Sequence, residues 1–179
     1  GLGLMQIQSH TLPNDTDQFV AMRWPAMGEV TRITNPITID HTLLRQYLLP
    51  GLFRLLASNR HHDLPQAVYE LGTVVRNHTN SDRFAFLVAE QNGGFAAVRG
   101  RIQAIMRDLG ASDYSIEPLG GDMGPWLTGR AAKVIVDGIH VGCFGEMDPH
   151  VGHHYELKVP LSGAEFDVAE LERALPDPV

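Results

Sequence analysis

The sequence predicts an α+β fold, in which helices pack on a mainly antiparallel sheet. Residues 131–136 and 139–144 have the composition of strands and flank Asp137 and Gly138, a pair that favours the two-residue turn of a β-hairpin. Apolar residues recur at helical spacing over 95–109, so an amphipathic helix is expected there. Because a hairpin pairs its strands antiparallel, this mixture favours α+β over a doubly wound parallel sheet.

The first half of the chain is predicted to mix strands with short helices. Four segments have the composition or the alternation of strands: 4–11, 29–34, 67–75 and 83–90. A polar loop, 76–82, is expected to separate the last two. A short helical turn is expected near 14–20, and Asp40 is expected to cap a longer helix. Pro50 lacks the N–H group that a helix interior requires, so it kinks this helix or begins another that ends near Asn59.

The second half is predicted to continue with helix 95–109, the hairpin and three shorter elements. Pro149 begins a short helix, 156–161 forms another strand, and Asp167 caps a last helix over 168–175. No segment approaches the roughly 18 consecutive apolar residues of a membrane-spanning helix, so no membrane association is expected.

Size and charge limit the classes of function. The chain has 179 residues, which at roughly 150 residues per domain corresponds to one domain. It carries 14 Lys and Arg against 21 Asp and Glu, for a net charge of −7. An autonomous nucleic-acid-binding protein is therefore not expected, since such binding depends on neutralising phosphates with basic residues. The single cysteine, Cys143, excludes an internal disulfide and is interpreted as a buried structural residue.

Motifs for nucleotide binding and for nucleophilic catalysis are absent from the sequence. It contains neither GxxxxGK(S/T) nor a GxGxxG that follows a strand, and no GxSxG for a serine nucleophile. Three histidines, His150, His153 and His154, have the spacing that places side chains on one helix face, which zinc can bind. The same pattern fits a solvent-exposed face, and we favour that interpretation because no glutamate follows the first histidine as in metalloproteases.

Arg130 and Glu146 stand at the ends of the predicted hairpin strands, in the segments 126–130 and 145–149. A hairpin brings such residues to the same end of a sheet, where an arginine and a carboxylate pair favourably. Two interpretations stay open: the arginine clamps a substrate, or the two side chains form a buried structural ion pair. From these residues alone we favour the ion pair.

Several short motifs, taken in order, resemble the core of the phenylalanyl-tRNA synthetase beta subunit. The matching motifs of the first half are Asn35-Pro36-Ile37, Leu44-Arg45, Leu48-Leu49-Pro50-Gly51-Leu52, Asn59 and Tyr69-Glu70-Leu71-Gly72. Those of the second half are Gly129-Arg130-Ala131, Gly142, Gly145-Glu146, Pro149, Pro160 and Glu165. The resemblance covers about residues 1–175 and favours the archaeal and eukaryotic type of beta chain.

The resemblance implies a class II aminoacyl-tRNA synthetase-like antiparallel sheet flanked by helices. It also implies that residues 1–179 form a single catalytic-like module, a fragment of a longer beta chain, which agrees with a first residue, Gly1, that is not methionine. In this family the alpha subunit activates phenylalanine and charges tRNA within an alpha2-beta2 tetramer, and the beta module is not a catalyst. The expected partner is therefore the alpha subunit, in the cytoplasm, and tRNA is expected to be bound only through the whole complex.

The resemblance assigns no catalytic, cofactor-binding or metal-binding residues to this module, although the family's complex uses ATP and magnesium. Class II catalysis requires one arginine on a strand and another on the last helix to hold ATP. The neighbours of Glu70 provide no such arginine, and Arg173 lacks the glycine-rich entry of the family's helix. The residues interpreted as structural or as part of an interface are Asn35, Pro36, Leu44, Arg45, Pro50, Gly51, Glu70, Gly129, Arg130, Gly145, Glu146 and Pro149.

The sequence departs from the family's pattern in places. Thr128 stands where proline usually precedes Gly129, Asp148 replaces a histidine, and the histidines after Pro149 replace more apolar residues. These departures leave two alternatives open beside the structural module. One is a stand-alone ligand-binding or regulatory synthetase-like domain, and the other is a small histidine-based metal-binding protein.

Overall fold

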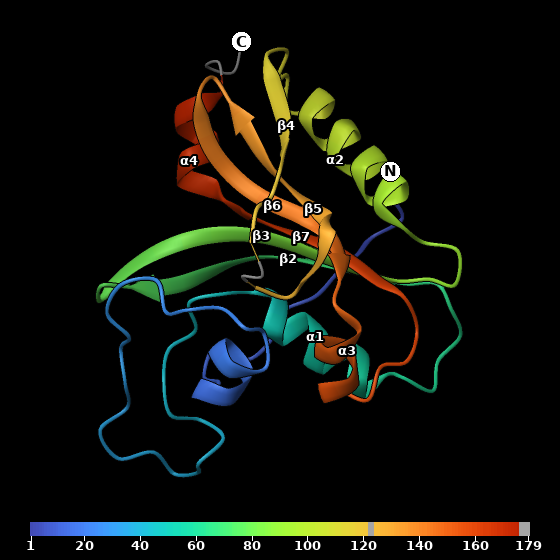
Figure 1. Cartoon of the computed structure of the whole chain (residues 1–179). Coiled ribbons are helices and arrows are strands. Elements are labelled where there is room, and N and C mark those ends of the chain that lie inside the picture. The colour runs from blue at the N-terminus through green and yellow to red at the C-terminus, as the bar shows by residue number, and fades with distance from the viewer. Residues whose placement is uncertain (122–123, 176–179) are drawn as a thin grey trace.

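Seven strands form one open sheet in the computed structural model, which describes residues 1–121 and 124–175 (Figure 1). The strand order is β1-β2-β3-β7-β6-β5-β4; β1 pairs parallel with β2 and the remaining neighbours pair antiparallel. The strands are β1 (Met5–Gln6), β2 (Gln66–Arg76), β3 (Thr79–Ala89), β4 (Tyr114–Pro118), β5 (Trp126–Val136), β6 (Ile139–Met147) and β7 (Leu161–Asp167). The helices are a π-helical turn η1 (Thr16–Val20), α1 (Leu49–Ser58), α2 (Phe95–Asp108), α3 (Pro149–His154) and α4 (Val168–Ala174). The predicted α+β class is confirmed, with a mixed rather than wholly antiparallel sheet.

Helices cover both faces of the sheet. α1 and α3 pack on one face, and α2 and α4 pack on the other (Figure 1). Strand β3 shows this division clearly, since Ala85 and Leu87 belong to the core of α1 and α3, whereas Phe86 and Val88 belong to the core of α2 and α4. Within the described part of the chain, no helix is long and apolar enough to cross a membrane.

The amphipathic helix and the hairpin lie where local sequence signals predicted them. α2 occupies the predicted segment and buries Val98, Ile102 and Met106 against the sheet. The β5–β6 hairpin turns at Asp137 and Gly138, whose φ angles are 47° and 75°. A turn of this kind requires positive φ at both central residues, which aspartate and glycine tolerate well.

The caps of the last two helices also agree with the prediction. Pro149 lies in the first turn of α3, where a missing N–H costs no helical hydrogen bond. A side-chain oxygen of Asp167 accepts a hydrogen bond from the backbone N–H of Glu170 at 3.2 Å, so α4 begins where it was expected.

Several predictions for the first half were wrong. Only Met5–Gln6 of the expected strand 4–11 is a strand, and 29–34 takes part in one isolated bridge, from Arg32 to Leu43. The helix expected from Asp40 onward is an irregular segment that precedes α1. Its backbone N–H groups donate to distant acceptors, among them the side chains of Gln18 and Glu165, instead of to a preceding turn.

Two further boundaries differ from the prediction. The polar stretch 76–82 is not a loop, because β2 and β3 continue to a two-residue turn at Asn77 and His78. These strand ends are exposed and polar, so they lack the apolar alternation of the buried part. The expected strand 156–161 is displaced to β7, since Glu156 adopts a φ of 59°, which an extended strand does not allow. Strand β4 was not predicted.

Candidate functional site

The structure joins Arg45 and Glu70 in a buried ion pair. Nη1 of Arg45 lies 2.8 Å from Oε1 of Glu70, and the two side chains are 5% and 1% exposed. Ser9 bridges them, because its hydroxyl donates to Oε2 of Glu70 at 2.6 Å and accepts from Nη1 of Arg45 at 3.0 Å. Nε of Arg45 donates to the carbonyl of Thr73 at 2.9 Å. Removing one partner of such a buried pair costs about 3–5 kcal/mol, because the other charge is left buried without compensation.

The glycines of the same motifs make room for this cluster. A Cβ atom at Gly51 would collide with the hydroxyl of Ser9, and one at Gly72 would lie 2.5 Å from Nη2 of Arg45. Pro50 is buried beside Gly51 in the first turn of α1. Four residues selected from the sequence, in three separate motifs, therefore meet in one packed unit around Ser9: Arg45, Pro50, Gly51 and Glu70.

A cavity of about 390 Å³ opens beside this unit, with Arg45 and Gly51 in its wall. Its buried carboxylate, Asp17, is paired with Arg54. The buried amide of Gln18 is hydrogen-bonded to the backbone of Tyr47 through both its oxygen and its nitrogen. The buried charged and amide side chains of this cavity thus have partners within the chain.

A second buried ion pair, between Arg83 and Glu165, was not predicted. Nε of Arg83 lies 2.7 Å from Oε1 of Glu165, and the side chains are 10% and 1% exposed. Glu165 also accepts the backbone N–H groups of Leu48 at 2.9 Å and Leu49 at 3.0 Å, so a residue of β7 caps the start of α1. The sequence contained one signal for this pair, because Arg83 begins the predicted strand 83–90, which is otherwise mostly apolar. A charged side chain in a buried strand requires a partner.

Arg130 and Glu146 do not form the buried ion pair that we favoured. The Arg130 side chain is 61% exposed, and its Nη1 lies 3.8 Å from Oε1 of Glu146. Oε1 of Glu146 instead accepts the backbone N–H of Phe95 at 2.7 Å, so Glu146 caps the start of α2. The β5–β6 ladder is irregular between Trp126 and Ala131, and such a bulge redirects the side chains beside it.

The glycines next to Arg130 and Glu146 are required by the backbone conformation and the close strand contacts of this hairpin. Gly129 adopts a φ of 76°, a conformation that favours glycine. A Cβ atom at Gly145 would collide with the carbonyl oxygen of Arg130 and lie 2.7 Å from the Cα of Ala131. The two motifs therefore contribute close strand packing and a helix cap.

Asp148, which replaces a histidine of the family's pattern, is the N-cap of α3. Its carboxylate accepts the backbone N–H of His150 at 2.8 Å and pairs with Arg23 at 3.0 Å. Burial opposes its charge, but the hydrogen bonds from His150 and the charge of Arg23 lower the pKa of Asp148 below its usual value. Asp148 therefore stays ionised well into the acidic range.

The three candidate metal-binding histidines lie on a short, exposed helix. α3 spans only Pro149–His154, and His150, His153 and His154 are all exposed. Nδ1 of His150 lies 3.0 Å from a carboxylate oxygen of Asp148, and the ring of His154 packs edge-on against Tyr155. Over residues 1–121 and 124–175, no group of three or more His, Cys, Asp and Glu side chains is placed to hold a metal ion.

Cys143 lies in β6 and is partly exposed, whereas a buried structural residue was predicted. Its Sγ lies 3.4 Å from Nε2 of His140. Desolvation by its surroundings still raises the pKa of the thiol to about 11. The thiol therefore stays protonated near neutral pH, where a catalytic cysteine would have to be a thiolate.

Residues 25–42 form a long loop that extends away from the sheet, at the lower left of Figure 1. Asn35 and Pro36 are exposed in this loop. The two isoleucines that follow are also exposed to solvent, Ile37 by 100% and Ile39 by 86%. Two large apolar side chains are thus exposed on a loop that extends away from the sheet.

The base of this loop is held in place by polar contacts. Both terminal nitrogens of Arg32 lie 2.8 Å from the carboxylate oxygens of Asp15, a bidentate pair. Hydrogen bonding to Arg32 lowers the pKa of Asp15. Leu44, another residue of the family-like motifs, is half-buried where the loop rejoins the core, and its N–H donates to the carbonyl of Thr31 at 2.9 Å.

The arginines nearest to the places of the family's ATP clamps are engaged within the chain. Arg76 on β2 donates to the carbonyl of Gln46 at 2.9 Å, and Arg83 on β3 is held by Glu165. Arg173 on α4 lies 2.8 Å from a carboxylate oxygen one turn earlier in the same helix. Because Arg76 and Arg83 already bind protein acceptors, these two arginines do not fit an ATP-binding clamp, whereas Arg173 is largely exposed.

Comparison with known proteins identifies relatives over most of the chain. Residues 1–168 match the family described as phenylalanyl-tRNA synthetase beta chain CLM domain. The phenylalanine–tRNA ligase beta subunit of Archaeoglobus fulgidus is 37% identical over 173 residues, which cover 94% of this chain and 31% of that protein. The beta subunits of Methanothrix thermoacetophila (35% over 169 residues) and Methanopyrus kandleri (32% over 177) cover 94% and 95% of this chain.

The chain spans a little under a third of the length of the curated relatives that it matches, since 31%, 31% and 30% of these three are covered. The family match contains each motif on which the resemblance was based, from Asn35 to Glu165. These relatives are archaeal, in agreement with the expected type of beta chain. The chain therefore belongs to the phenylalanyl-tRNA synthetase beta chain CLM domain family.

Proposed function

We propose that this chain is a non-catalytic structural module of a phenylalanyl-tRNA synthetase beta subunit and that it binds the alpha subunit in an alpha2-beta2 enzyme. In this proposal residues 1–179 are one module within a longer beta chain that acts in the cytoplasm. The alpha subunit charges tRNA with phenylalanine and uses ATP and magnesium. The beta module meets tRNA only through the whole complex.

The observation that carries this proposal is the placement of the motif residues. Arg45 and Glu70 neutralise each other inside the molecule, and Glu165 is occupied by Arg83 and by the start of α1. Glu146 caps a helix. Arg45, Glu70 and Glu165 are thus bound to partners within the chain, which favours a structural role for these motif residues over a catalytic one.

The arrangement of the sheet supports a class II synthetase-like fold as part of the proposal. In the order β2-β3-β7-β6-β5-β4, each strand pairs antiparallel with its neighbour, and helices cover both faces of the sheet. The resemblance implies such a core, and β1 extends it by a short parallel pair with β2.

The loop 25–42 is the surface that we propose for the alpha subunit. Ile37 and Ile39 lie beyond reach of the core, and apolar side chains exposed together on a projecting loop mark contact sites for other proteins. Asn35 and Pro36 precede them and restrict the backbone of the loop, since proline has a fixed φ. Burying the two isoleucines on a partner removes apolar surface from water.

This proposal is tested by co-elution of the chain with its cognate alpha subunit on a sizing column with light scattering. The unchanged chain is expected to form a joint peak with equal numbers of both subunits. The double substitution Ile37→Ser with Ile39→Ser is expected to weaken the association at least about tenfold, because each isoleucine contributes about 1.5–3 kcal/mol when buried.

The matched control is Leu109→Ser, which removes another exposed apolar side chain at the end of α2, outside the loop. It is expected to co-elute like the unchanged chain. Both variants are expected to keep the unfolding free energy within about 0.5 kcal/mol, since surface substitutions have small effects. Separate elution of the unchanged chain and the alpha subunit would contradict the proposal.

A further inference from the structure

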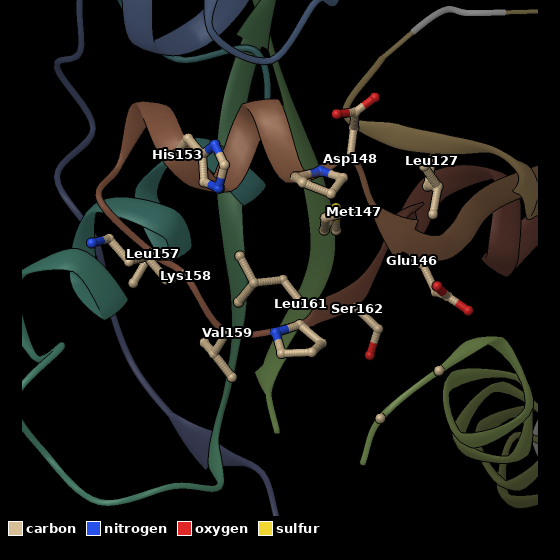
Figure 2. Close-up of a pocket in the computed structure, with 15 residues that line it drawn as sticks. Leu127, Glu146, Met147, Asp148, His153, Leu157, Lys158, Val159, Leu161 and Ser162 are labelled. Carbon is tan, nitrogen blue, oxygen red and sulfur yellow. The ribbon is translucent and has the colours of Figure 1, made fainter. Parts of the chain in front are cut away.

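A cavity of about 220 Å³ lies where the end of β6, the start of β7, helix α3 and the entry into α2 meet (Figure 2). Gly93 and Gly94 form its edge at the entry into α2, and Leu127, Met147 and Leu161 are apolar residues in its lining. The space exceeds that of a single water molecule, which occupies about 30 Å³ in the liquid, and is sufficient for a small organic molecule.

Ser162 lines this cavity with a hydroxyl that lacks a partner. The residue is 3% exposed, and its Oγ has no hydrogen-bond partner within the described part of the chain. Buried side-chain polar atoms are in the large majority of cases hydrogen-bonded. The hydroxyl of Ser162 therefore points to a partner that the chain itself does not supply.

Glu146 stands opposite Ser162 in the register between β6 and β7, so the two side chains lie next to each other on one face of the sheet. Oε1 of Glu146 accepts the N–H of Phe95, whereas Oε2 has no hydrogen bond from residues 1–121 or 124–175. Arg130 lies 3.8 Å from Oε1 and is largely exposed, so it neutralises the carboxylate only weakly. This corner combines a negative charge with a buried hydroxyl.

These features select a compact cation that carries several N–H donors. The carboxylate repels anions, and the hydroxyl of Ser162 can accept as well as donate a hydrogen bond. Hard divalent metals take six or more oxygen ligands, which this corner does not offer. An ammonium group has three donors and can bond Glu146 and Ser162 together, while an alkyl chain packs on the apolar lining.

The other charged groups of the cavity leave this corner negative. Asp148 is occupied by Arg23 and by the start of α3. His153 and Lys158 are exposed, and both lie across the cavity from Glu146 (Figure 2). A cation at Glu146 and Ser162 is therefore separated from His153 and Lys158, and the nearest positive group is the largely exposed guanidinium of Arg130.

We propose that Glu146 and Ser162 bind the ammonium group of a small primary amine, whose alkyl part extends into the cavity beside Leu127. Nothing in this inference depends on association with the alpha subunit. The site is separate from the loop 25–42, so the two proposals succeed or fail independently.

The test is a titration of the chain with n-butylammonium, followed by backbone amide NMR shifts and by calorimetry. Saturable binding is expected, with the largest shifts at Phe95 and Ser162. Glu146→Gln keeps an acceptor for the N–H of Phe95 but removes the charge, and it is expected to weaken binding at least about tenfold. The uncharged n-butanol is expected to produce no saturable shifts at these amides.

Two further variants separate binding from structure. Ser162→Ala is expected to weaken binding at least about threefold while unfolding at the same or a higher temperature, because it removes an unpartnered buried hydroxyl. Glu117→Gln, which removes an exposed carboxylate on β4, is expected to bind like the unchanged chain. The proposal is overturned if the amine does not saturate the shifts, if n-butanol binds equally well, or if Glu146→Gln leaves the affinity unchanged.

Discussion

Buried carboxylates in this chain neutralise arginines and also accept backbone N–H groups. Glu165 does both, since it pairs with Arg83 and caps α1. Glu70 pairs with Arg45 and accepts from Ser9. Asp148 likewise pairs with Arg23 and accepts the N–H of His150, and these contacts lower its pKa, so its contribution to stability depends on pH.

Asp148 offers the clearest test of this effect. Its pKa is lowered in the folded state, relative to about 3.9 in an unfolded chain, so its stabilisation is present above about pH 4 and is lost as pH falls through the folded pKa. Asp148→Ala is expected to cost about 1–2 kcal/mol at pH 7, because it removes the cap of α3.

Asp148→Asn is the matched control, since asparagine caps a helix as well as aspartate but does not titrate. Urea unfolding at a series of pH values is expected to show the unchanged chain losing its advantage over Asp148→Asn below about pH 4. A constant difference between the two proteins down to pH 2 would contradict the role assigned to the charge of Asp148.

At the scale of elements, two glycines differ in whether the structure has space for a side chain at their position. Gly145 in β6 is required for space, because a Cβ atom there would collide with the backbone of Arg130 in β5. Gly100 in α2 has no heavy atom within 4 Å of the place of a Cβ. The same substitution is therefore expected to have opposite effects in the two elements.

Gly145→Ala is expected to destabilise the chain by about 1–3 kcal/mol, since neither the carbonyl of Arg130 nor the backbone of Ala131 can move without disturbing the ladder. Gly100→Ala is expected to stabilise it by up to about 1 kcal/mol, because alanine is the better helix former. Thermal and urea unfolding measure both. Equal effects of the two substitutions would refute the close contact at Gly145.

At the scale of the whole molecule, helices cover both faces of the open sheet, and the chain carries a net negative charge. The net charge is −7, and exposed arginines such as Arg32 and Arg173 are paired with carboxylates. Binding of RNA requires a set of basic side chains that release counterions from phosphates. A molecule with this charge distribution is suited to contacts with protein rather than with nucleic acid.

We therefore expect the isolated chain to bind tRNA no more tightly than an unrelated acidic protein does at about 0.05 M salt, where electrostatic binding is strong. Filter binding or fluorescence anisotropy with labelled tRNA measures this. Tight binding that weakens steeply as salt increases would contradict the proposal that tRNA contacts this module only through the whole complex.

Features that depend on neighbouring residues could be predicted from the sequence. The helix over Phe95–Asp108, the hairpin turn at Asp137 and Gly138 and the cap at Asp167 follow from periodicity and turn chemistry, which act over a few residues. The family-like motifs also identified Arg45, Gly51 and Glu70, although not the reason for which they occur together.

Which of these residues come into contact could not be predicted and became known from the fold. Arg45 pairs with Glu70, and Glu165 caps a helix more than a hundred residues earlier in the chain. Glu146 caps the start of α2 and does not form a buried ion pair with Arg130. The segment before α1 is irregular because its N–H groups are satisfied by such distant acceptors. The physical reason is that the burial of a charge or of an N–H group is set by the topology of the whole sheet, which no local window of sequence contains.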